Sequence, residues 1–596
     1  MNYKKIGILI LLFVFMNGIF SQKKSIHFYD NFKYNNKKIF SEKEWDNFND
    51  YQKGQNKNFF DENCELEKIV FGWFPYWMGT SYNDLNFSLL SDIAYFSYEV
   101  NANTGNYDNI HYWKTTNLID IAHENNCRVS LTATLFSGHA NFFNNEESVQ
   151  TLIDSLISLV QYRNVKGINI DFESVPSSQK DNLTNFVIKL SNEFHEAVDD
   201  AFLSIAVPAV DWNDVFDVSA MRNYIDLFLI MAYEYHWRGG DYAGPNSPKN
   251  NGQIWSPYDA TRSVNKYLSK GAYKEKLALA IPYYGYDWKT ENDNVRSETV
   301  ANGVAKTFAN VMSNLQNYDV IFEEQSSNPY YVYQNNSDWH QCWYDDKESL
   351  SLKYDMVNMR DIAGIGIWAL SYDGSHNELW EAIQEKFTDC RITNCQGFFT
   401  DMGGKFGNYH NNEDYFFTIS PENADSLTVN FEEFNVELNY DTLFIYYGSE
   451  INEDSLINFY TGENSPGIIK SYSGIMSFYF KSDGATTKSG WKAYWSCDYI
   501  FSDTKKIYFQ DLKIYPNPFE NKIFIENKNN KIFELEIFNV FGKRIFYKKN
   551  FNEKSLNLKD DLQKGIYFLS IKKGNIKKNF KSVHMEVTLG QICVKN

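Results

Sequence analysis

The stretch Gly167-Ile168-Asn169-Ile170-Asp171-Phe172-Glu173 has the pattern of a buried strand that ends in two carboxylates. Side chains alternate across a strand, so Asn169, Asp171 and Glu173 share one face and the apolar residues share the other. Asp171 and Glu173 are then about 6–7 Å apart along the strand. Two carboxyls this close in a partly dry site favour keeping one of them protonated near neutral pH, which is what a general acid requires.

A lone Asp-x-Glu pair at a strand end is more often two solvent-exposed carboxylates than a catalytic pair. The surrounding pattern decides between these two interpretations. Short apolar strands alternate with helical patterns from about residue 67 to 388, and residues 149–160 have apolar residues at helical spacing. The candidate strands are Lys68–Trp73, Asp92–Tyr98, Arg128–Thr134, Gly167–Phe172, Phe202–Pro208, Leu227–Tyr233, Leu277–Pro282 and Gly364–Leu370. Eight such strands with intervening helices predict an α/β fold, a closed (β/α)8 TIM barrel, whose chemistry lies at the C-terminal strand ends.

Length and charge indicate further domains and exclude one class of partner. A chain of 596 residues is too long for one core. The net charge of −19 argues against nucleic acid as a partner. From residue 501 onward, 19 Lys and Arg against 10 Asp and Glu leave +9, so the rest of the chain carries −28. This shift predicts a domain boundary near residue 500.

The N-terminus has the pattern of a secretory signal peptide over residues 1–21, with Lys4 and Lys5 before an apolar run. Residues 22–66 are polar and rich in Asn and Lys, and we expect them to form an extended leader. No other stretch is long and apolar enough to cross a bilayer, so we expect an exported mature chain without a transmembrane segment.

Two all-β regions follow the predicted barrel. Residues 390–498 contain short alternating strands such as Leu427–Val436 and Thr442–Tyr447, the pattern of a β-sandwich. The seven cysteines are an odd number, and a bridge between Cys395 and Cys497 would staple the ends of this region. Residues 507–580 predict a small all-β module with strands at Lys522–Glu526, Glu534–Asn539 and Gly565–Ile571.

Residues 67–388 resemble glycoside hydrolase family 18, the chitinase-type barrels. The family's fourth-strand signature is D-G-x-D-x-D-x-E, and residues 166–173 match its last acidic pair but not its two earlier acidic positions. Other strand ends are similar too: Met231-Ala232-Tyr233-Glu234 to M-x-Y-D with Glu replacing Asp, Ile367-Trp368-Ala369 to the eighth-strand segment, and residues 71–77 to the aromatic first strand. Asn at position 169 also occurs in the spore-cortex-hydrolase branch, which cleaves N-acetylglucosaminyl bonds in peptidoglycan.

The resemblance implies a substrate-assisted retaining mechanism without a cofactor. It makes Glu173 the acid and then the base, while Asp171 and Tyr233 hold the substrate's 2-acetamido group. It places Trp368 under the distorted sugar, although an isolated Trp at a strand end is also a common barrel-core residue. The remaining expected substrate-binding residues are Asn169, Glu234, Met231 and Tyr76.

Residues 395–497 resemble a CUB domain, through segments such as residues 434–437, 440–443 and 490–494. In calcium-binding members, acidic residues at the positions of Glu437, Asp441 and Asp483 supply hard oxygen ligands for Ca²⁺. The alternative is three solvated loop acids.

Residues 507–580 resemble the type A C-terminal sorting domain of type IX secretion, through residues 515–519, 537–543 and 565–568. That resemblance implies the type IX secretion machinery as a partner. It also implies a location outside the bacterial outer membrane, either secreted or at the cell surface.

The leading hypothesis is a secreted hydrolase of β-linked N-acetylglucosamine polymers, with chitin first. A second hypothesis takes peptidoglycan or N-glycan cores as substrate. A third is a non-catalytic glycan-binding or adhesive protein. Members of that last kind typically lose the terminal Glu, whereas Glu173 is present here.

Overall fold

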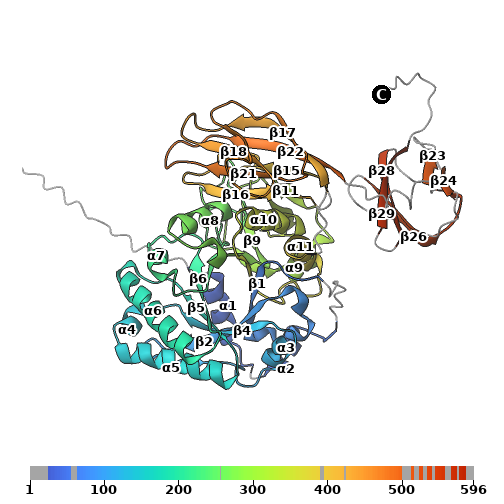
Figure 1. Cartoon of the computed structure of the whole chain (residues 1–596). Helices are drawn as coiled ribbons and strands as arrows, with labels where there is room; N and C mark the ends of the chain where they lie inside the picture. Colours follow the sequence, from blue (N-terminus) through green and yellow to red (C-terminus); the bar gives the residue numbers. More distant parts are fainter. Residues whose placement is uncertain are drawn as a thin grey trace, which may run out of the picture. The chain divides into compact units, whose positions relative to one another are not determined.

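The computed structural model describes residues 24–39, 41–54, 64–255, 257–389, 395–421, 424–499, 512–515, 522–527, 533–539, 544–557, 565–573 and 576–584. The predicted signal peptide and its cleavage site lie outside these residues. The chain forms two compact units, which divide between Asp498 and Tyr499, close to the boundary that the charge shift predicts (Figure 1).

The first unit contains a closed parallel barrel at the positions that the sequence predicts (Figure 1). Its strands are β1 (Ile69–Pro75), β2 (Asp92–Val100), β4 (Arg128–Leu135), β5 (Gly167–Phe172), β6 (Phe202–Pro208), β7 (Leu227–Met231), β8 (Leu277–Pro282) and β14 (Gly364–Trp368). Parallel pairing runs through this order, and β1 pairs with both β2 and β14, which closes the barrel. The short β3 (Tyr107–Asn109) extends β2.

Helices surround the barrel and bury one face each. They are α3 (Leu118–Glu124), α4 (His139–Phe143), α5 (Glu146–Tyr162), α6 (Lys180–Ala197), α7 (Val218–Met221), α8 (Ala260–Ser269), α9 (Phe308–Leu315), α10 (Lys347–Met359) and α11 (Glu378–Phe387). Short 3-10 helices are η1 (Tyr76–Met78), η2 (Ser81–Asp84), η3 (Phe87–Leu89), η4 (Ser177–Gln179) and η5 (Lys274–Lys276). The predicted helix at 149–160 is confirmed as part of α5, which begins after its N-cap Asn145.

Strand β5 is buried on both faces, as a barrel strand between core and helices must be. Its first residue, Gly167, lies very close to β4, since a Cβ there would be 2.0 Å from Ser130 Oγ and 2.8 Å from Ser130 Cα. The glycine of the signature therefore serves close strand packing.

A five-stranded antiparallel sheet lies between β8 and β14 in the sequence, and no pattern in the sequence predicted it. Its strands are β9 (Tyr284–Thr290), β10 (Val304–Thr307), β11 (Ile321–Glu323), β12 (Asn328–Asn335) and β13 (Asp338–Trp343). A buried ion pair, Asp345 with Lys353, lies where this sheet joins α10.

The expected extended leader is wrong for its described residues, which form the helices α1 (Ile26–Asn35) and α2 (Glu42–Phe48). Each begins at a serine N-cap, Ser25 or Ser41, whose hydroxyl accepts a backbone N–H. Polar composition suggested an extended segment, but each helix buries one face on the barrel, α1 through Ile26, His27, Asp30 and Asn31 and α2 through Trp45.

Two four-stranded antiparallel sheets form the second part of this unit and confirm the predicted sandwich. Their strands are β15 (Gln396–Thr400), β16 (Asp414–Ile419), β17 (Ala424–Asn435), β18 (Thr442–Tyr447), β19 (Leu456–Tyr460), β20 (Ile468–Ser471), β21 (Met476–Lys481) and β22 (Gly490–Tyr499). The predicted disulfide joins Cys395 to Cys497.

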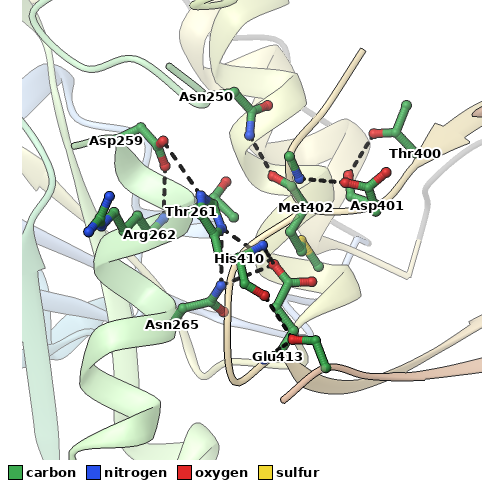
Figure 2. Close-up of polar contacts among 12 residues, drawn as sticks. Asn250, Asp259, Thr261, Arg262, Asn265, Thr400, Asp401, Met402, His410 and Glu413 are labelled. Carbon is green, nitrogen blue, oxygen red and sulfur yellow. Dashed lines mark hydrogen bonds and ion pairs between the residues drawn. The ribbon is translucent and has the colours of Figure 1, made fainter. Parts of the chain in front are cut away.

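The sandwich packs on the barrel beside α8 through polar contacts (Figure 2). Asn250 donates to the carbonyl of Met402 at 2.6 Å, and Asn265 donates to Glu413 at 3.1 Å. Glu413 and Asn250 are both buried, so these bonds are shielded from water.

The second unit is all β, as the sequence predicts. Its strands are β23 (Leu512–Tyr515), β24 (Lys522–Asn527), β25 (Phe533–Asn539), β26 (Arg544–Phe551), β27 (Ser555–Asn557), β28 (Gly565–Lys573) and β29 (Ile576–His584). Among the described residues of the whole chain, no helix has the length and apolar character needed to cross a membrane.

Candidate active site

Asp171 and Glu173 lie at the C-terminal end of β5, as the strand pattern predicts, and both are buried. Burial raises the pKa of Asp171. Burial also raises the pKa of Glu173, and the charge of Asp171 raises it further. The pair therefore retains protons more strongly than free carboxyls do, which suits a proton donor.

The C-terminal end of β7 and the loop after it supply three of the predicted residues. Tyr233 is buried, and burial together with the nearby carboxyls raises its pKa, so the phenol stays protonated. Glu234 accepts a hydrogen bond from Tyr286 at 2.7 Å, while its backbone N–H donates to Asn246 at 2.8 Å. Met231 ends β7 and is buried beside them.

Trp368 ends β14 and is fully buried in the described structure. Its ring lies edge-on to Trp73, Trp77 and Phe96. One face is covered by His27 of α1, with ring centroids 3.6 Å apart and an interplanar angle of 25°. Trp368 thus presents a flat face toward the predicted catalytic groups.

His27 connects the leader to these groups, and sequence reasoning missed it. Its Nδ1 lies 2.8 Å from Asp171 Oδ2 and 3.4 Å from Glu173 Oε1, and its Nε2 lies 2.7 Å from the Tyr233 hydroxyl. Burial lowers the pKa of His27 to about 4. The ring is therefore neutral near pH 7 and can donate through one nitrogen while accepting at the other.

A cavity of about 340 Å³ adjoins the carboxylates and extends away from β14. Glu173, Met231, Tyr233 and Glu234 line it, together with exposed aromatic side chains such as Trp212. Trp212 lies edge-on to Tyr258 at 4.8 Å. Aromatic faces beside a buried acid form a surface on which sugar rings can stack.

Tyr76 does not line this cavity. It lies in η1, where its hydroxyl donates to Asn35 of α1 at 2.8 Å and its ring stacks on His111 at 3.4 Å. The structure therefore brings seven of the eight predicted catalytic and substrate-binding residues near one another and places Tyr76 against the leader.

Asn169 lies two residues before Asp171, on the same face of β5, and is fully buried. Its Oδ1 accepts from Trp73 Nε1 at 2.8 Å, and its Nδ2 donates to Ser204 Oγ at 2.9 Å. Asn169 thereby positions Trp73, which packs against both His27 and Trp368.

Three carboxylates in the sandwich meet as predicted. Ligand oxygens of Glu437, Asp441 and Asp483 lie within 4.8 Å of one another. Asp441 accepts from the Tyr409 hydroxyl and from the backbone N–H of Asp483, whereas Glu437 Oε2 is buried without a hydrogen-bond partner. An all-oxygen set with an orphaned carboxylate oxygen fits a hard cation such as Ca²⁺.

Comparison with known families identifies the barrel. Residues 9–373, more than half of the chain, match the family Glycosyl hydrolases family 18. The chain belongs to glycosyl hydrolase family 18. Residues 390–495 match the CUB domain and residues 513–585 match the Secretion system C-terminal sorting domain. The latter match indicates that this family 18 protein is exported to the cell surface or beyond.

Curated relatives of this family 18 protein are distant and are matched over part of their length. The putative sporulation-specific glycosylase YdhD of Bacillus subtilis is 25% identical over 38% of this chain and 52% of its own length. The cortical fragment-lytic enzyme of B. subtilis is 21% identical over 47% of this chain and 64% of its own. Human di-N-acetylchitobiase is 24% identical over 39% of this chain and 66% of its own length. The aligned regions thus span about half to two thirds of these relatives.

Solved structures with similar folds include a family 18 chitinase from Cycas revoluta in complex with (GlcNAc)3. It is 18% identical, with a TM-score of 0.49, over 53% of this chain and 99% of its own. Human YKL-39, described as a pseudo-chitinase with retained chitooligosaccharide binding properties, is 16% identical with a TM-score of 0.49, over 54% of this chain and 99% of its own.

One sequence signal could have found α1 in this family 18 protein. Ser25 precedes a stretch in which the buried residues Ile26, His27, Asp30 and Asn31 recur at spacings of one, three and four. That is the periodicity of a helix with one buried face, but the polar residues in it disguised the pattern.

Proposed function

We propose that the barrel hydrolyses β-linked N-acetylglucosamine polymers by a substrate-assisted, retaining mechanism. The observation that carries this proposal is the convergence of Asp171, Glu173 and Tyr233 on a single ring that stacks on Trp368. A flat face, a proton donor and two groups that can hold an amide are what such a reaction needs.

In the proposed reaction, Glu173 donates its proton to the leaving glycosidic oxygen. The carbonyl oxygen of the substrate's 2-acetamido group attacks the anomeric carbon, and the glycosidic C–O bond breaks. Asp171 and Tyr233 hold the acetamido group and stabilise the charge that develops on the resulting oxazolinium ring. Glu173 then takes a proton from water as that water attacks the anomeric carbon, so the configuration is retained.

Mass spectrometry of products from N-acetylglucosamine oligomers tests this proposal. Because α1 lies in the site, two forms are assayed: the intact chain, and a chain cut after folding at a site-specific protease sequence inserted after Gly54, with the N-terminal piece separated. Gly54 is exposed, and no atom lies within 4 Å of the position that a Cβ would take there. Short oligomers from the cut chain would support the proposal, and no cleavage of any oligomer would contradict it.

Peptidoglycan or an N-glycan core is the second substrate class. Asn169 in place of an acid and the similarity to the cortical fragment-lytic enzyme favour it. Purified peptidoglycan and N-glycan cores in the same assay decide between the polymers. Binding of oligomers without hydrolysis would instead support a non-catalytic glycan-binding protein.

Asn169→Asp should shift the acid limb of the pH–rate profile upward by about one pH unit. A carboxylate two residues from Asp171 on the same face is a like charge, which raises the pKa of Asp171. Asp171 then loses its proton at higher pH, so activity that needs ionised Asp171 appears later as pH rises. The profile of kcat/KM for the cut chain measures this.

The control for this pH experiment is Asn192→Asp, an exposed position on α6. It makes the same chemical change far from Asp171, and its profile should match that of the wild type. An acid limb that moves no further in Asn169→Asp than in the control would contradict the assigned role of Asp171.

We propose that Glu437, Asp441 and Asp483 bind Ca²⁺ in the sandwich. Millimolar CaCl₂ should raise the melting temperature of the intact chain by a few degrees, since a ligand that binds only the folded state stabilises it. EDTA should reverse the increase, and Asp441→Asn should abolish it, because one carboxylate ligand is lost. A melting temperature that CaCl₂ leaves unchanged in the wild type would contradict this site.

A further inference from the structure

His27 occupies the position that the proposed reaction assigns to the substrate. Its flat ring lies 3.6 Å from Trp368, where a sugar would stack. Its two nitrogens bind Asp171 and Tyr233, the groups assigned to the acetamido group. A five-membered ring held in this way and a sugar cannot be present together.

We propose that residues 24–54 form an inhibitory segment, which blocks the glycan site until it is displaced or removed by proteolysis. The proposal rests on the proposed function for the nature of the blocked ligand. The blockage itself rests on the contacts of α1 with the described site residues.

The tip of the segment complements the charge of the site. Asp171, Glu173 and Glu234 are acidic, and the groups that meet them are donors. The backbone N–H of Ile26 donates to Glu234 Oε2 at 3.1 Å, and His27 Nδ1 lies 2.8 Å from Asp171 Oδ2. Hydrogen-bond donation to these acids therefore favours the docked segment.

The next turns of α1 hold the helix across the mouth of the barrel. Asp30 accepts from the Tyr372 hydroxyl at 2.8 Å, and Tyr34 stacks on Trp77 at 4.8 Å. Lys24, which precedes His27 in the sequence, donates to the Phe136 carbonyl at 2.6 Å. The segment thus contacts loops that follow several barrel strands.

Helix α2 attaches the segment to the loop that follows β1. Asp46 accepts from the backbone N–H of Thr80 at 2.6 Å and from its hydroxyl at 2.8 Å, and Asn49 donates to the Trp77 carbonyl at 2.7 Å. Trp45 is buried beneath these contacts.

The barrel itself does not need this segment to close. None of the eight barrel strands contains a residue before Ile69, and the closing pairs are β1 with β2 and β1 with β14. Phe32 and Phe48 remain 62% and 48% exposed, so one side of each helix faces solvent. Removing the segment therefore opens the site without breaking the sheet.

His27→Glu in the intact chain tests the inference directly. A carboxylate at this position faces Asp171, Glu173 and Glu234, so repulsion should release α1. We expect oligomer hydrolysis to increase at least about 100-fold, which corresponds to a site that is open in about 1% or less of wild-type molecules. Phe32→Glu, an exposed position on the same helix, is the matched control and should leave the rate unchanged.

Cutting the chain after Gly54 provides a second test of the inhibitory segment, and this test does not depend on a substitution. The cut chain, with the N-terminal piece separated, should be as active as His27→Glu. A synthetic peptide of residues 24–54 should inhibit it in competition with substrate, and the same peptide with His27→Ala should inhibit at least about 10-fold less well. An intact chain that hydrolyses as fast as both the cut chain and His27→Glu would overturn the proposal.

Acrylamide quenching of tryptophan fluorescence separates this inference from the proposed function. Trp368 is fully buried under His27, so its emission should become quenchable when the piece is removed and shielded again when the peptide is added. The same measurement on the Trp368→Phe variant, which lacks the Trp368 emission, shows which part of the quenching belongs to Trp368. If no form hydrolyses any oligomer, the proposed function fails, and this reversible quenching still supports occlusion. A Trp368 signal that is equally quenchable with and without the segment overturns it.

Discussion

Glu173→Gln should lower kcat of the cut chain by about 10³-fold or more while leaving oligomer binding within a few-fold of wild type. Glutamine keeps the shape of the side chain but can neither donate the proton to the leaving group nor accept one from water. General acid–base catalysis contributes about 10²- to 10⁴-fold, and the proposed reaction uses Glu173 in both of its steps. Product analysis measures turnover, and calorimetry with N-acetylglucosamine oligomers measures binding.

Glu196→Gln is the matched control, because Glu196 is exposed on α6 and the substitution is chemically the same. Its turnover should equal that of the wild type. If Glu173→Gln retained more than about a tenth of wild-type turnover, another residue would have to supply the proton. If both proteins bound oligomers and neither cleaved them, the barrel would be a glycan-binding protein.

Lys353→Met should lower the free energy of unfolding by about 3–5 kcal/mol, because it removes one partner of a fully buried ion pair. Lys353 and Asp345 are both completely shielded from solvent. Asp345 also accepts from Ser349 at 2.7 Å and from Asn328 at 3.1 Å, so its carboxylate would stay in place without a countercharge. Urea denaturation followed by tryptophan fluorescence measures the loss.

Lys347→Met, in the first turn of the same helix, is the control for that experiment. Lys347 pairs with Glu381 and Glu385 at a partly exposed surface, where a pair contributes about 1 kcal/mol or less. The double variant Asp345→Asn with Lys353→Met removes both charges and should recover part of the loss. Equal effects of Lys347→Met and Lys353→Met would contradict the role assigned to the buried pair.

The barrel strands were predictable because their pattern is local. Each barrel strand is a short apolar run between polar segments, and burial on both faces makes such runs apolar throughout. Strands β5, β6 and β8 begin and end at the predicted residues, whereas the observed β7 stops at Met231, two residues before the predicted end. Tyr233 and Glu234 therefore lie in the loop after the strand, where catalytic groups of barrels are found.

The sheet β9–β13 was missed for the opposite reason. Its residues alternate weakly and carry many aromatic side chains, which pair across the strands, as Tyr330 of β12 does when it stacks on Trp343 of β13. Antiparallel strands of this kind are stabilised by cross-strand packing, which no single segment displays in its own sequence.

The sequence by itself determined the eight barrel strands, the acidic pair at the end of β5 and the short alternating strands of the sandwich, because the periodicity or residue types within a few neighbouring positions specify each of them. Only the tertiary structure decided that His27 reaches Asp171, 144 residues away, and stacks on Trp368. The position of α1 depends on the shape and charge of a pocket built from the ends of several strands. That pocket exists only after the barrel has closed, so no local pattern in the sequence of α1 could reveal what this helix binds.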